Sequence, residues 1–312
     1  MDAMTGLLDG ILAHGAFLLR TVVDPPWSLR IEDEAPLTVV AVVRGTAWVV
    51  PDDGAPAELG PGDVALVRGP DHYVVADHPD TPPAIVIHPD QTCTTLHGEE
   101  LPLALDLAVR TWGSRTDGGT ELLTGTYQGH SEVSRRLLDD LPPLVVVHGE
   151  EGDQALVDLL AVEVGRDRPG QEVVLDRLLD LLLVAVLRAW FDGEDRAAPS
   201  WWRADADPVV GPAVRLLHQD PARPWTIATL AAEVGVSRAA LARRFTDLVG
   251  EPPIAFLTAW RLALAADLLR RPDTTIGAVA REVGYGSPFA LSTAFKRAYG
   301  ISPHQHRTRA AS

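Results

Sequence analysis

Two stretches near the C-terminus repeat one another almost in register, and this repeat constrains the fold more than any other feature of the chain. The first runs from Thr226 to Pro253 and the second from Thr275 to Pro303. A repeat this close in register predicts a repeated structural unit. Allowing for one residue inserted in the second copy, Gly286, the matching pairs are Thr226/Thr275, Ile227/Ile276, Glu233/Glu282, Val234/Val283, Gly235/Gly284, Ser237/Ser287, Leu241/Leu291, Phe245/Phe295, Gly250/Gly300 and Pro253/Pro303.

Each copy has the pattern of a helix, a tight turn and a second helix. In the first copy, apolar residues at helical spacing lead to Gly235, whose tolerance of positive φ suits the end of a helix. Ser237 then provides an N-cap for a second helix, expected over 238–249. The second copy repeats this arrangement and predicts its second helix over 288–299. The pattern therefore predicts two helix-turn-helix motifs, joined by a helix over Ile254–Arg271.

The segment Pro208–Arg309 resembles the DNA-binding domain of the AraC/XylS family of transcription regulators. The phrases that carry the resemblance are LAAEVGVSRAALARRF, AWRLALAADLLR and IGAVAREVGYGSPFALSTAFKRAYGISPHQHR. The resemblance implies that the second helix of each motif enters the major groove of DNA, and that one monomer reads two adjacent groove segments. We therefore expect residues 208–312 to form an all-α DNA-binding domain.

Charge is distributed unevenly along the chain, whose formal net charge is −16. Residues 208–312 contain 13 Lys and Arg against 7 Asp and Glu, a net charge of +6, which leaves −22 for residues 1–207. Such asymmetry is typical of a localised nucleic-acid surface. The acidic half would repel DNA and confine contact to the basic end. Charge thus supports DNA binding by the C-terminal domain, although a net charge of +6 is common in ordinary domains.

The N-terminal half has the sequence pattern of β-strands and turns. After Trp27, short runs rich in β-forming residues alternate with turns rich in Gly, Pro and Asp. Runs at this spacing predict a small antiparallel barrel or jelly roll. The expected strands and extended segments are Leu37–Val43, Ala47–Val50, Val64–Val67, His72–Val75, Ile85–Ile87, Thr120–Tyr127 and Leu141–Val147.

Two runs within this half resemble the conserved motifs of cupins. LGPGDVALVRGPDHYVV is similar to the second cupin motif, and LTVVAVVRGTAWVV to the end of the first. The resemblance implies a cupin-like domain over residues 1–192 that binds a small effector or mediates assembly. The predicted fold class is therefore α+β: an N-terminal antiparallel cupin-like β-barrel with flanking helices, followed by a C-terminal all-α domain with two helix-turn-helix motifs.

Three helices are expected to flank the barrel, over Leu7–Leu19, Asp153–Gly165 and Glu172–Phe191. The last is apolar on more than one face, which leaves two interpretations: a helix packed wholly on the barrel, or one that also meets a second subunit. The family resemblance favours the second, a homodimer. The residues expected to mediate dimerisation are Leu175, Leu178, Leu179, Leu182 and Val186.

Residues 193–207 are polar and lack periodicity, which is typical of a linker between domains. Trp201 and Trp202 are unusual in such a segment. They anchor the linker to one domain or carry a signal from a ligand, and the sequence does not decide between these roles.

The cupin likeness raises an enzymatic alternative. Metal cupins take two His and a carboxylate from the first motif and one His from the second. Here the first motif contains no His, and only His72 survives from the second. Because such sites need three or four protein ligands, we expect no metal, no other cofactor and no catalytic residue. A cupin enzyme fused to a DNA-binding domain is the rival interpretation.

Cys93 is the only cysteine, which excludes an internal disulfide and fits a reducing cytoplasm. It leaves a further alternative, a regulator that senses oxidants through Cys93, although no second cysteine is present to resolve an intramolecular disulfide. We expect a cytoplasmic protein without a membrane span. The most apolar window, Val173–Phe191, is interrupted by Asp176, Arg177, Asp180 and Arg188.

The second helix of each motif is expected to meet DNA through its exposed residues. Arg reads guanine O6 and N7 bidentately, whereas Ala, Phe and the Thr methyl group contact the thymine methyl. Arg243 is the candidate for base reading, while Arg244, Lys296 and Arg297 are expected to clamp phosphates. The complete expected set is Ser237, Arg238, Ala239, Ala242, Arg243, Arg244, Ser287, Pro288, Phe289, Ala290, Thr293, Lys296 and Arg297.

The second motif carries Phe289 and Thr293 where many family members have Arg or another polar residue, so it should read DNA more by apolar contact and shape. Together these patterns predict a transcription regulator. Its expected partners are double-stranded DNA at promoter sites, an unknown small-molecule effector, a second copy of the chain and, if it is an activator, RNA polymerase. The sequence does not identify the effector or distinguish activation from repression.

Overall fold

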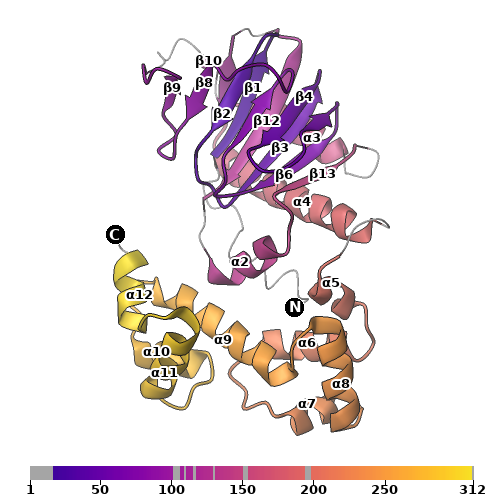
Figure 1. Cartoon of the computed structure of the whole chain (residues 1–312), viewed down its shortest axis with the longest axis vertical. Helices are drawn as coiled ribbons and strands as arrows, with labels where there is room; N and C mark the ends of the chain where they lie inside the picture. The colour runs from indigo at the N-terminus through magenta and orange to yellow at the C-terminus, as the bar shows by residue number, and fades with distance from the viewer. Residues whose placement is uncertain are drawn as a thin grey trace. The chain divides into compact units, whose positions relative to one another are not determined.

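The computed structural model describes residues 17–100, 106–108, 110–114, 117–128, 131–149, 154–193 and 198–310 (Figure 1). These residues fall into two compact units. The N-terminal unit is formed from the described residues within 17–128 and 138–193, and the C-terminal unit from 131–137 and 198–310.

The N-terminal unit is a sandwich of two β-sheets. Over the described residues, one sheet has seven strands in the order β10-β11-β1-β12-β3-β6-β13, and the other has six in the order β5-β4-β7-β2-β8-β9. The sheets are jelly-roll-like and do not close into one barrel over these strands. The strands are β1 (Phe17–Val23), β2 (Ser28–Ile31), β3 (Leu37–Arg44), β4 (Ala47–Pro51), β5 (Ala57–Leu59), β6 (Val64–Arg68), β7 (Tyr73–Ala76), β8 (Ile85–Ile87), β9 (Cys93–Thr95), β10 (Asp106–Ala108), β11 (Thr111–Gly113), β12 (Thr120–Tyr127) and β13 (Leu144–Val147).

Strand β3 is apolar at almost every position, because both of its faces are covered. One face meets the opposite sheet, and the other meets α3 (Gln154–Val164). A continuous apolar run is what a strand buried on both faces requires. Helix α4 (Gln171–Asp192) covers the same outer face (Figure 1). The hydroxyl of Tyr127 on β12 donates a hydrogen bond of 3.0 Å to the carbonyl oxygen of Leu179 on α4.

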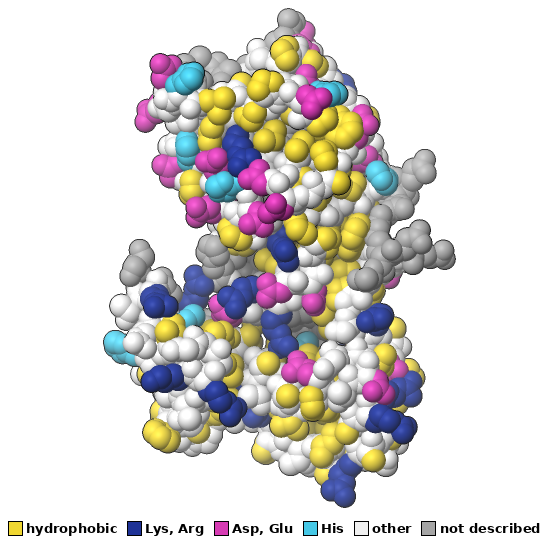
Figure 2. Space-filling model, viewed as in Figure 1, with side chains coloured by type: hydrophobic (Ala, Val, Ile, Leu, Met, Phe, Trp, Pro, Cys, Tyr) yellow, Lys and Arg dark blue, Asp and Glu magenta, His cyan; other side chains and the backbone are white. Residues whose placement is uncertain are grey.

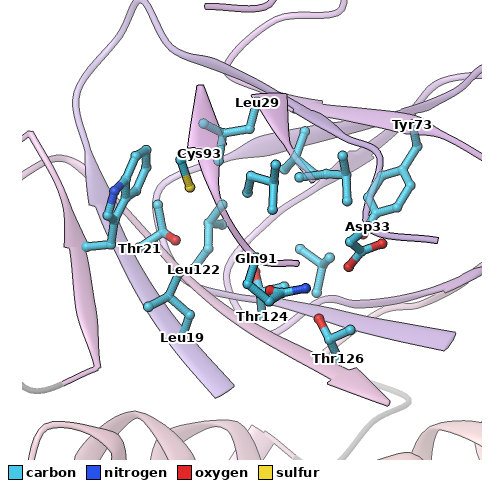
Figure 3. Close-up of a pocket in the computed structure, with 15 residues that line it drawn as sticks. Leu19, Thr21, Leu29, Asp33, Tyr73, Gln91, Cys93, Leu122, Thr124 and Thr126 are labelled. Carbon is cyan, nitrogen blue, oxygen red and sulfur yellow. The ribbon is translucent and has the colours of Figure 1, made fainter. Parts of the chain in front are cut away.

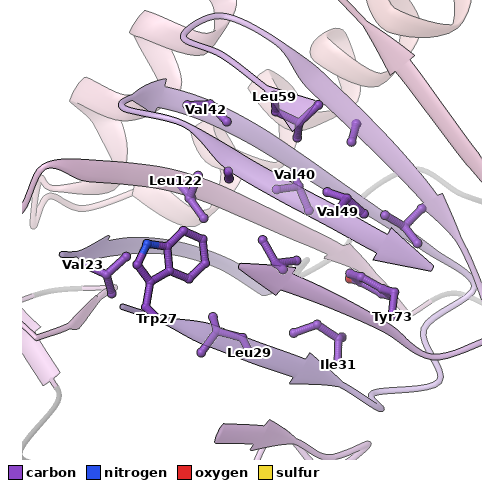
Figure 4. Close-up of a cluster of buried hydrophobic side chains, with 14 residues drawn as sticks. Val23, Trp27, Leu29, Ile31, Val40, Val42, Val49, Leu59, Tyr73 and Leu122 are labelled. Atoms are coloured by element: carbon purple, nitrogen blue, oxygen red, sulfur yellow. The ribbon is translucent and has the colours of Figure 1, made fainter. Parts of the chain in front are cut away.

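Apolar side chains from both sheets pack in the interior of the sandwich. Trp27, Val42, Val49 and Leu59 belong to this buried cluster and reach into the space between the sheets (Figure 4). Burial of each such side chain contributes roughly 1.5–3 kcal/mol relative to exposure. The cluster adjoins the ligand pocket described below, because Leu29, Val40 and Leu122 belong both to the cluster and to the pocket lining.

The C-terminal unit is entirely helical over the described residues. Its two helix-turn-helix motifs are α7 with α8 and α10 with α11, joined by α9. The helices are α2 (Glu132–Asp139), α5 (Ser200–Asp205), α6 (Val210–Gln219), α7 (Ile227–Glu233), α8 (Arg238–Val249), α9 (Pro253–Leu269), α10 (Ile276–Glu282), α11 (Pro288–Tyr299) and α12 (Pro303–Ala310).

Helix α9 is apolar on several faces because both motifs pack against it. Near its start, the ring of Phe256 meets that of Phe245 of the first motif, edge to face, with centroids 5.6 Å apart. Near its end, Leu262 and Leu269 join the buried cluster of the second motif. One helix therefore carries both motifs, as the sequence repeat predicts.

Several expected elements differ from those observed. Residues 17–19 of the helix expected over Leu7–Leu19 lie in β1, because Phe17–Val23 pairs along its whole length with β12. The rest of that expected helix lies outside the described residues. The expected linker contains α5, which packs on α6 and α8 of the C-terminal unit. Strands β2, β5, β9, β10 and β11 and helix α2 were not expected from the sequence.

Among the described residues, no single helix has both the length and the hydropathy of a membrane span. Helices α8 and α9 meet these criteria only as a pair, and the pair bends by 56° at the break between them.

Candidate nucleic-acid interface and ligand pocket

Helices α8 and α11 are built on the same frame. Each begins at a serine whose hydroxyl accepts a hydrogen bond from the backbone amide three residues later, at 3.2 Å for Ser237 and 3.1 Å for Ser287. Each ends at a left-handed glycine. Each also fixes its inner face with one buried Leu and one buried Phe. The frame leaves one face of each helix exposed.

Twelve of the thirteen residues expected to contact DNA are exposed, and Ala242 is half-buried. Phe289 is 81% exposed, although it is a large aromatic side chain in the first turn of α11. The hydroxyl of Thr293 donates to the carbonyl oxygen of Phe289 at 3.0 Å. Its hydroxyl is therefore engaged by its own helix, which leaves the methyl group as its free contact surface.

The basic side chains on these helices are not equivalent. Arg244 forms an ion pair of 2.7 Å with Asp207, which also accepts hydrogen bonds from two backbone amides at the start of α6. Arg238, Arg243, Lys296 and Arg297 make no ion pair with a carboxylate among the described residues. Figure 2 shows the same contrast on a larger scale: Lys and Arg spread over the helical unit, whereas Asp and Glu gather on the sandwich. Arg244 is thus held inside the protein's own framework, and the other four remain available to phosphates or bases.

Arg261 on α9 and Gly284 in the second motif both contact the segment that precedes the first motif. Arg261 donates hydrogen bonds from Nε to the carbonyl oxygen of Pro221 at 2.6 Å and from Nη2 to that of Arg223 at 2.8 Å. Gly284, in the turn of the second motif, lies so close to the same segment that an added Cβ would be 2.7 Å from the Cα atom of Ala222. The segment before the first motif therefore packs on the turn of the second.

Helix α2 docks on α9 within the same unit. Asp267 accepts hydrogen bonds from the hydroxyl of Ser131 at 2.7 Å and from the backbone amide of Glu132 at 2.8 Å. These bonds satisfy polar groups at the start of α2 that the helix itself leaves unpaired. Arg136 completes the contact with an ion pair of 3.2 Å to Glu251 and a guanidinium 5.3 Å from the ring centroid of Phe256. The only local sign of this contact is the acidic residue Asp267 within a mainly apolar helix.

The ligand pocket lies between the two sheets of the N-terminal unit and encloses about 640 Å³, its open mouth included. A mainly apolar lining with a few polar side chains is typical of sites that bind small organic molecules. Figure 3 shows Asp33 and Gln91 among the side chains that surround it. The lining residues are Leu19, Thr21, Leu29, Ile31, Asp33, Val40, Tyr73, Val75, Ile87, Gln91, Cys93, Trp112, Leu122, Thr124 and Thr126.

The metal-cupin alternative has no ligand set in the described parts of the chain, where no three His, Cys, Asp or Glu side chains are grouped to hold a metal ion. His72 lies outside the pocket lining, with Nδ1 at 3.8 Å from a carboxylate oxygen of Glu32. Cys93 is half-buried and lines the pocket. The sequence did not place Cys93 in a ligand site, because its strand β9 was not expected.

Four of the five residues expected at a dimer interface are buried inside their own domain: Leu175, Leu179, Leu182 and Val186 are each at most 3% exposed. The physical reason is that α4 packs against both the seven-stranded sheet and α3. Apolar residues on more than one face of the helix are therefore buried inside the domain. Leu178 is half-buried. The outward face of α4 instead carries Val174 and Leu181, which are 44% and 52% exposed.

Trp201 is buried in the C-terminal unit, and its ring meets that of Trp202 edge to face at 5.9 Å. Helix α5, which carries both, packs on α8. The two tryptophans therefore attach this segment to the helical unit.

One unit with two helix-turn-helix motifs on a shared helix, and a second unit formed by a β-sandwich with an internal pocket, define a DNA-binding regulator with a sensory domain. Comparison with known families agrees: residues 2–192 match the cupin family model and residues 230–309 match a helix-turn-helix domain. The chain belongs to the AraC-like transcription regulators and carries an N-terminal cupin domain.

Relatives align with the whole chain. A putative AraC-like transcription regulator of Streptomyces lividans is 32% identical over 98% of each chain. Another, from Streptomyces antibioticus, is 31% identical, again over 98% of each chain. Among solved structures, the DNA-binding domain of AdpA in complex with a target DNA is 33% identical, covers 33% of this chain and 93% of its own, and has a TM-score of 0.31.

Proposed function

We propose that this regulator reads promoter DNA by placing α8 and α11 in two successive segments of the major groove. The observation that carries the proposal is the shared frame of the two helices, which buries Leu and Phe and turns out two different sets of side chains. Arg243 would read a guanine bidentately. Lys296 and Arg297 would contact phosphates, and Phe289 with Thr293 would meet thymine methyl groups.

Selection from a randomised duplex library with the full chain tests this reading. Because the two helices belong to one unit, the expected site has two segments, centred roughly 34 Å or one helical turn apart. Because their exposed residues differ, the two segments should differ in sequence and the monomer site should not be palindromic. Enrichment of a single segment, protected in one groove only, would contradict the two-helix reading.

We also propose that a small molecule in the ligand pocket controls DNA binding. Support comes from the connection between pocket and motifs: β12 contributes Leu122, Thr124 and Thr126 to the pocket, and the chain then continues into α2, which docks on α9. Any change that a ligand makes at β12 is thereby linked to the helix that carries both motifs. Couplings of this kind typically change affinity by about 5- to 150-fold.

The contact between α2 and α9 allows the proposed control of DNA binding to be tested without a ligand. Asp267→Ala removes the acceptor for Ser131 and Glu132, so the first amide protons of α2 should exchange faster and DNA affinity should change several-fold, within the roughly 5- to 150-fold range of such couplings. Asp273→Ala, at an exposed acid beyond the end of α9, is the matched control and should change neither. Faster exchange without a change in DNA affinity would show that α2 is docked but does not influence the motifs.

A homodimer formed through the outward face of α4 completes the proposal, with Val174 and Leu181 supplying exposed apolar contacts. Leu181→Asp should give folded monomers in sedimentation. The neighbouring Leu182→Asp places a charge at a position only 1% exposed, and should unfold the N-terminal unit instead. A Leu181→Asp variant that still sediments as the wild-type dimer would move the interface elsewhere.

The protein would act in the cytoplasm, would contact RNA polymerase if it is an activator, and would not be an enzyme. A promoter fusion measured with and without the protein distinguishes activation from repression. Metal analysis of purified protein addresses the enzymatic alternative, since a cupin enzyme would retain a stoichiometric ion.

A further inference from the structure

Among the described residues that line the ligand pocket, Asp33 is the one acid and none is basic. Along β2 and its continuation, alternate residues point inward, so Asp33 follows Leu29 and Ile31 into the cavity. Its Oδ1 accepts a hydrogen bond from the backbone amide of Ala35 at 3.2 Å. No Lys, Arg or His belongs to the lining. The carboxyl group is thus held against a mainly apolar cavity whose described lining contains no basic side chain, and His72 is the nearby basic group outside that lining.

The pleat of the strands is what keeps basic side chains out of the cavity. Arg20 lies between the inward-facing Leu19 and Thr21, so it points outward, where it pairs with Glu121 at 2.7 Å. Arg30 lies between Leu29 and Ile31 and pairs on the outer surface with Asp52, also at 2.7 Å. Neither guanidinium can turn inward without reversing the register of its strand.

Gln91 contributes another polar side chain to the same cavity. Its side-chain Nε2 is buried and has no hydrogen-bond partner among the described residues. Its backbone has a φ of +65°, an uncommon conformation for a residue other than glycine. Buried polar groups are normally paired, and unpaired ones together with strained backbone gather at ligand sites.

We propose that the pocket binds a small, mainly apolar organic amine, whose ammonium group pairs with Asp33 and whose body carries a hydrogen-bond acceptor for Gln91. The apolar walls of Leu29, Val75 and Leu122 exclude water from this pair. A carboxylic acid of the same shape would bring two negative charges together with no cation between them, so it should be rejected. The inference rests on the proposed function only in taking this pocket as the site of control.

A ligand-independent measurement tests the role of Asp33. Burial raises the pKa of Asp33, while hydrogen bonding to the Ala35 amide and the nearby His72 oppose the rise. Tyr73 faces the same carboxyl, and Glu32 and Glu34 flank it in the chain. A raised pKa in the folded state means that the wild type loses stability as pH rises from the unfolded value, 3.8, through the folded one.

Asp33→Asn removes this loss while keeping an acceptor for Ala35. The variant should therefore match the wild type in stability at pH 3 and exceed it at pH 7, in denaturant titrations. Greater stability of a protein that lacks a polar site residue is typical of residues kept for binding. A variant less stable than the wild type at pH 7 would make the carboxylate structural and overturn the proposal.

Three probes with one skeleton test the ligand class directly: indole-3-ethylamine, indole-3-ethanol and indole-3-propionic acid. Calorimetry with the full chain should give the tightest binding for the amine and the weakest for the acid. Asp33→Asn should weaken the amine roughly tenfold to a hundredfold, the usual range for a hydrogen bond to a charged group, and leave the alcohol within about twofold. A 5-methoxy derivative of the amine adds an acceptor for Gln91, and Gln91→Leu should weaken that derivative more than the parent amine.

The outcomes separate this inference from the control of DNA binding. If the acid binds as tightly as the amine, if Asp33→Asn leaves amine binding unchanged, or if none of the three probes binds, the ligand class is wrong. If the amine binds through Asp33 but DNA affinity is the same with and without it, the ligand class stands and the proposed control fails.

Discussion

The two recognition helices share a frame and differ in what they expose. Helices α8 and α11 have the same length, the same serine cap and the same left-handed glycine at the end. In α8 the unpaired basic residues, Arg238 and Arg243, lie toward the start. In α11 they lie in the last turn, at Lys296 and Arg297. The buried frame is therefore repeated while the distribution of charge is reversed along the helix.

Position by position, Arg243 of the first helix is replaced by Thr293 in the second, and Ala239 by Phe289. A guanidinium suits a guanine edge, whereas an aromatic ring and a methyl group suit thymine. The comparison indicates that the repeat supplies two equivalent supports, and that reading DNA depends on a few outward positions that do not affect packing.

The largest expected effect is a difference in unfolding free energy between glycine-to-alanine changes in the turns of the two motifs. Gly235 and Gly284 have φ values of +71° and +80°, so either glycine to alanine change costs about 1–2 kcal/mol in backbone strain. An added Cβ meets nothing within 4 Å at Gly235, but at Gly284 it meets the backbone of Ala222. Gly284→Ala should therefore cost a further 1–3 kcal/mol or so of unfolding free energy. Urea titrations of both variants measure the difference, and equal losses would mean that the segment before the first motif does not rest on the second turn.

The next effect concerns base reading. Arg243→Ala should lose roughly 1–3 kcal/mol of preference at one base pair, because a bidentate contact to guanine is removed. Phe289→Ala should reduce preference in the other segment, with an unchanged salt slope, because its contact is apolar. Binding to a randomised library measures both. A sequence preference that survives Arg243→Ala would assign base reading in α8 to another residue.

A smaller effect separates two basic residues of similar exposure. Lys296→Thr gives α11 the residue that α8 carries at the equivalent position, Thr246. It should weaken binding to all sequences alike and reduce the salt slope by about 0.9, the value for one phosphate contact. Arg244→Ala should leave the slope unchanged, because Arg244 is paired with Asp207. A reduced slope in Arg244→Ala would mean that this ion pair opens when DNA binds.

The smallest effect is on stability. Arg244 is about half exposed, so its pair with Asp207 is screened by solvent, and Arg244→Ala should cost at most about 1 kcal/mol of unfolding free energy. Asp207→Ala should cost more, because it also removes the acceptor for the backbone amides of Val209 and Val210. Thermal unfolding of the two variants gives this comparison, and equal losses would deny Asp207 its capping role.

The sequence by itself determined the two helix-turn-helix motifs, including the bounds of α8 and α11. The reason is that the signals are local: an apolar stripe, a serine cap and a glycine all lie within one motif, and two copies reinforce each other. It also determined most of the central strands of the sandwich, including Thr120–Tyr127, whose apolar runs are set by burial.

Only the tertiary structure decided which apolar residues of α4 remain outside, because burial there depends on contacts with a sheet and a second helix. It likewise brought Asp267 to the start of α2, 135 residues away from Glu132 in the chain. The pocket forms only when the two sheets pack together and enclose a space. Nothing in the sequence around Asp33 or Gln91 indicates that these residues line it. Contacts between distant segments are set by the packing of the whole chain, and a local pattern of residues does not contain them.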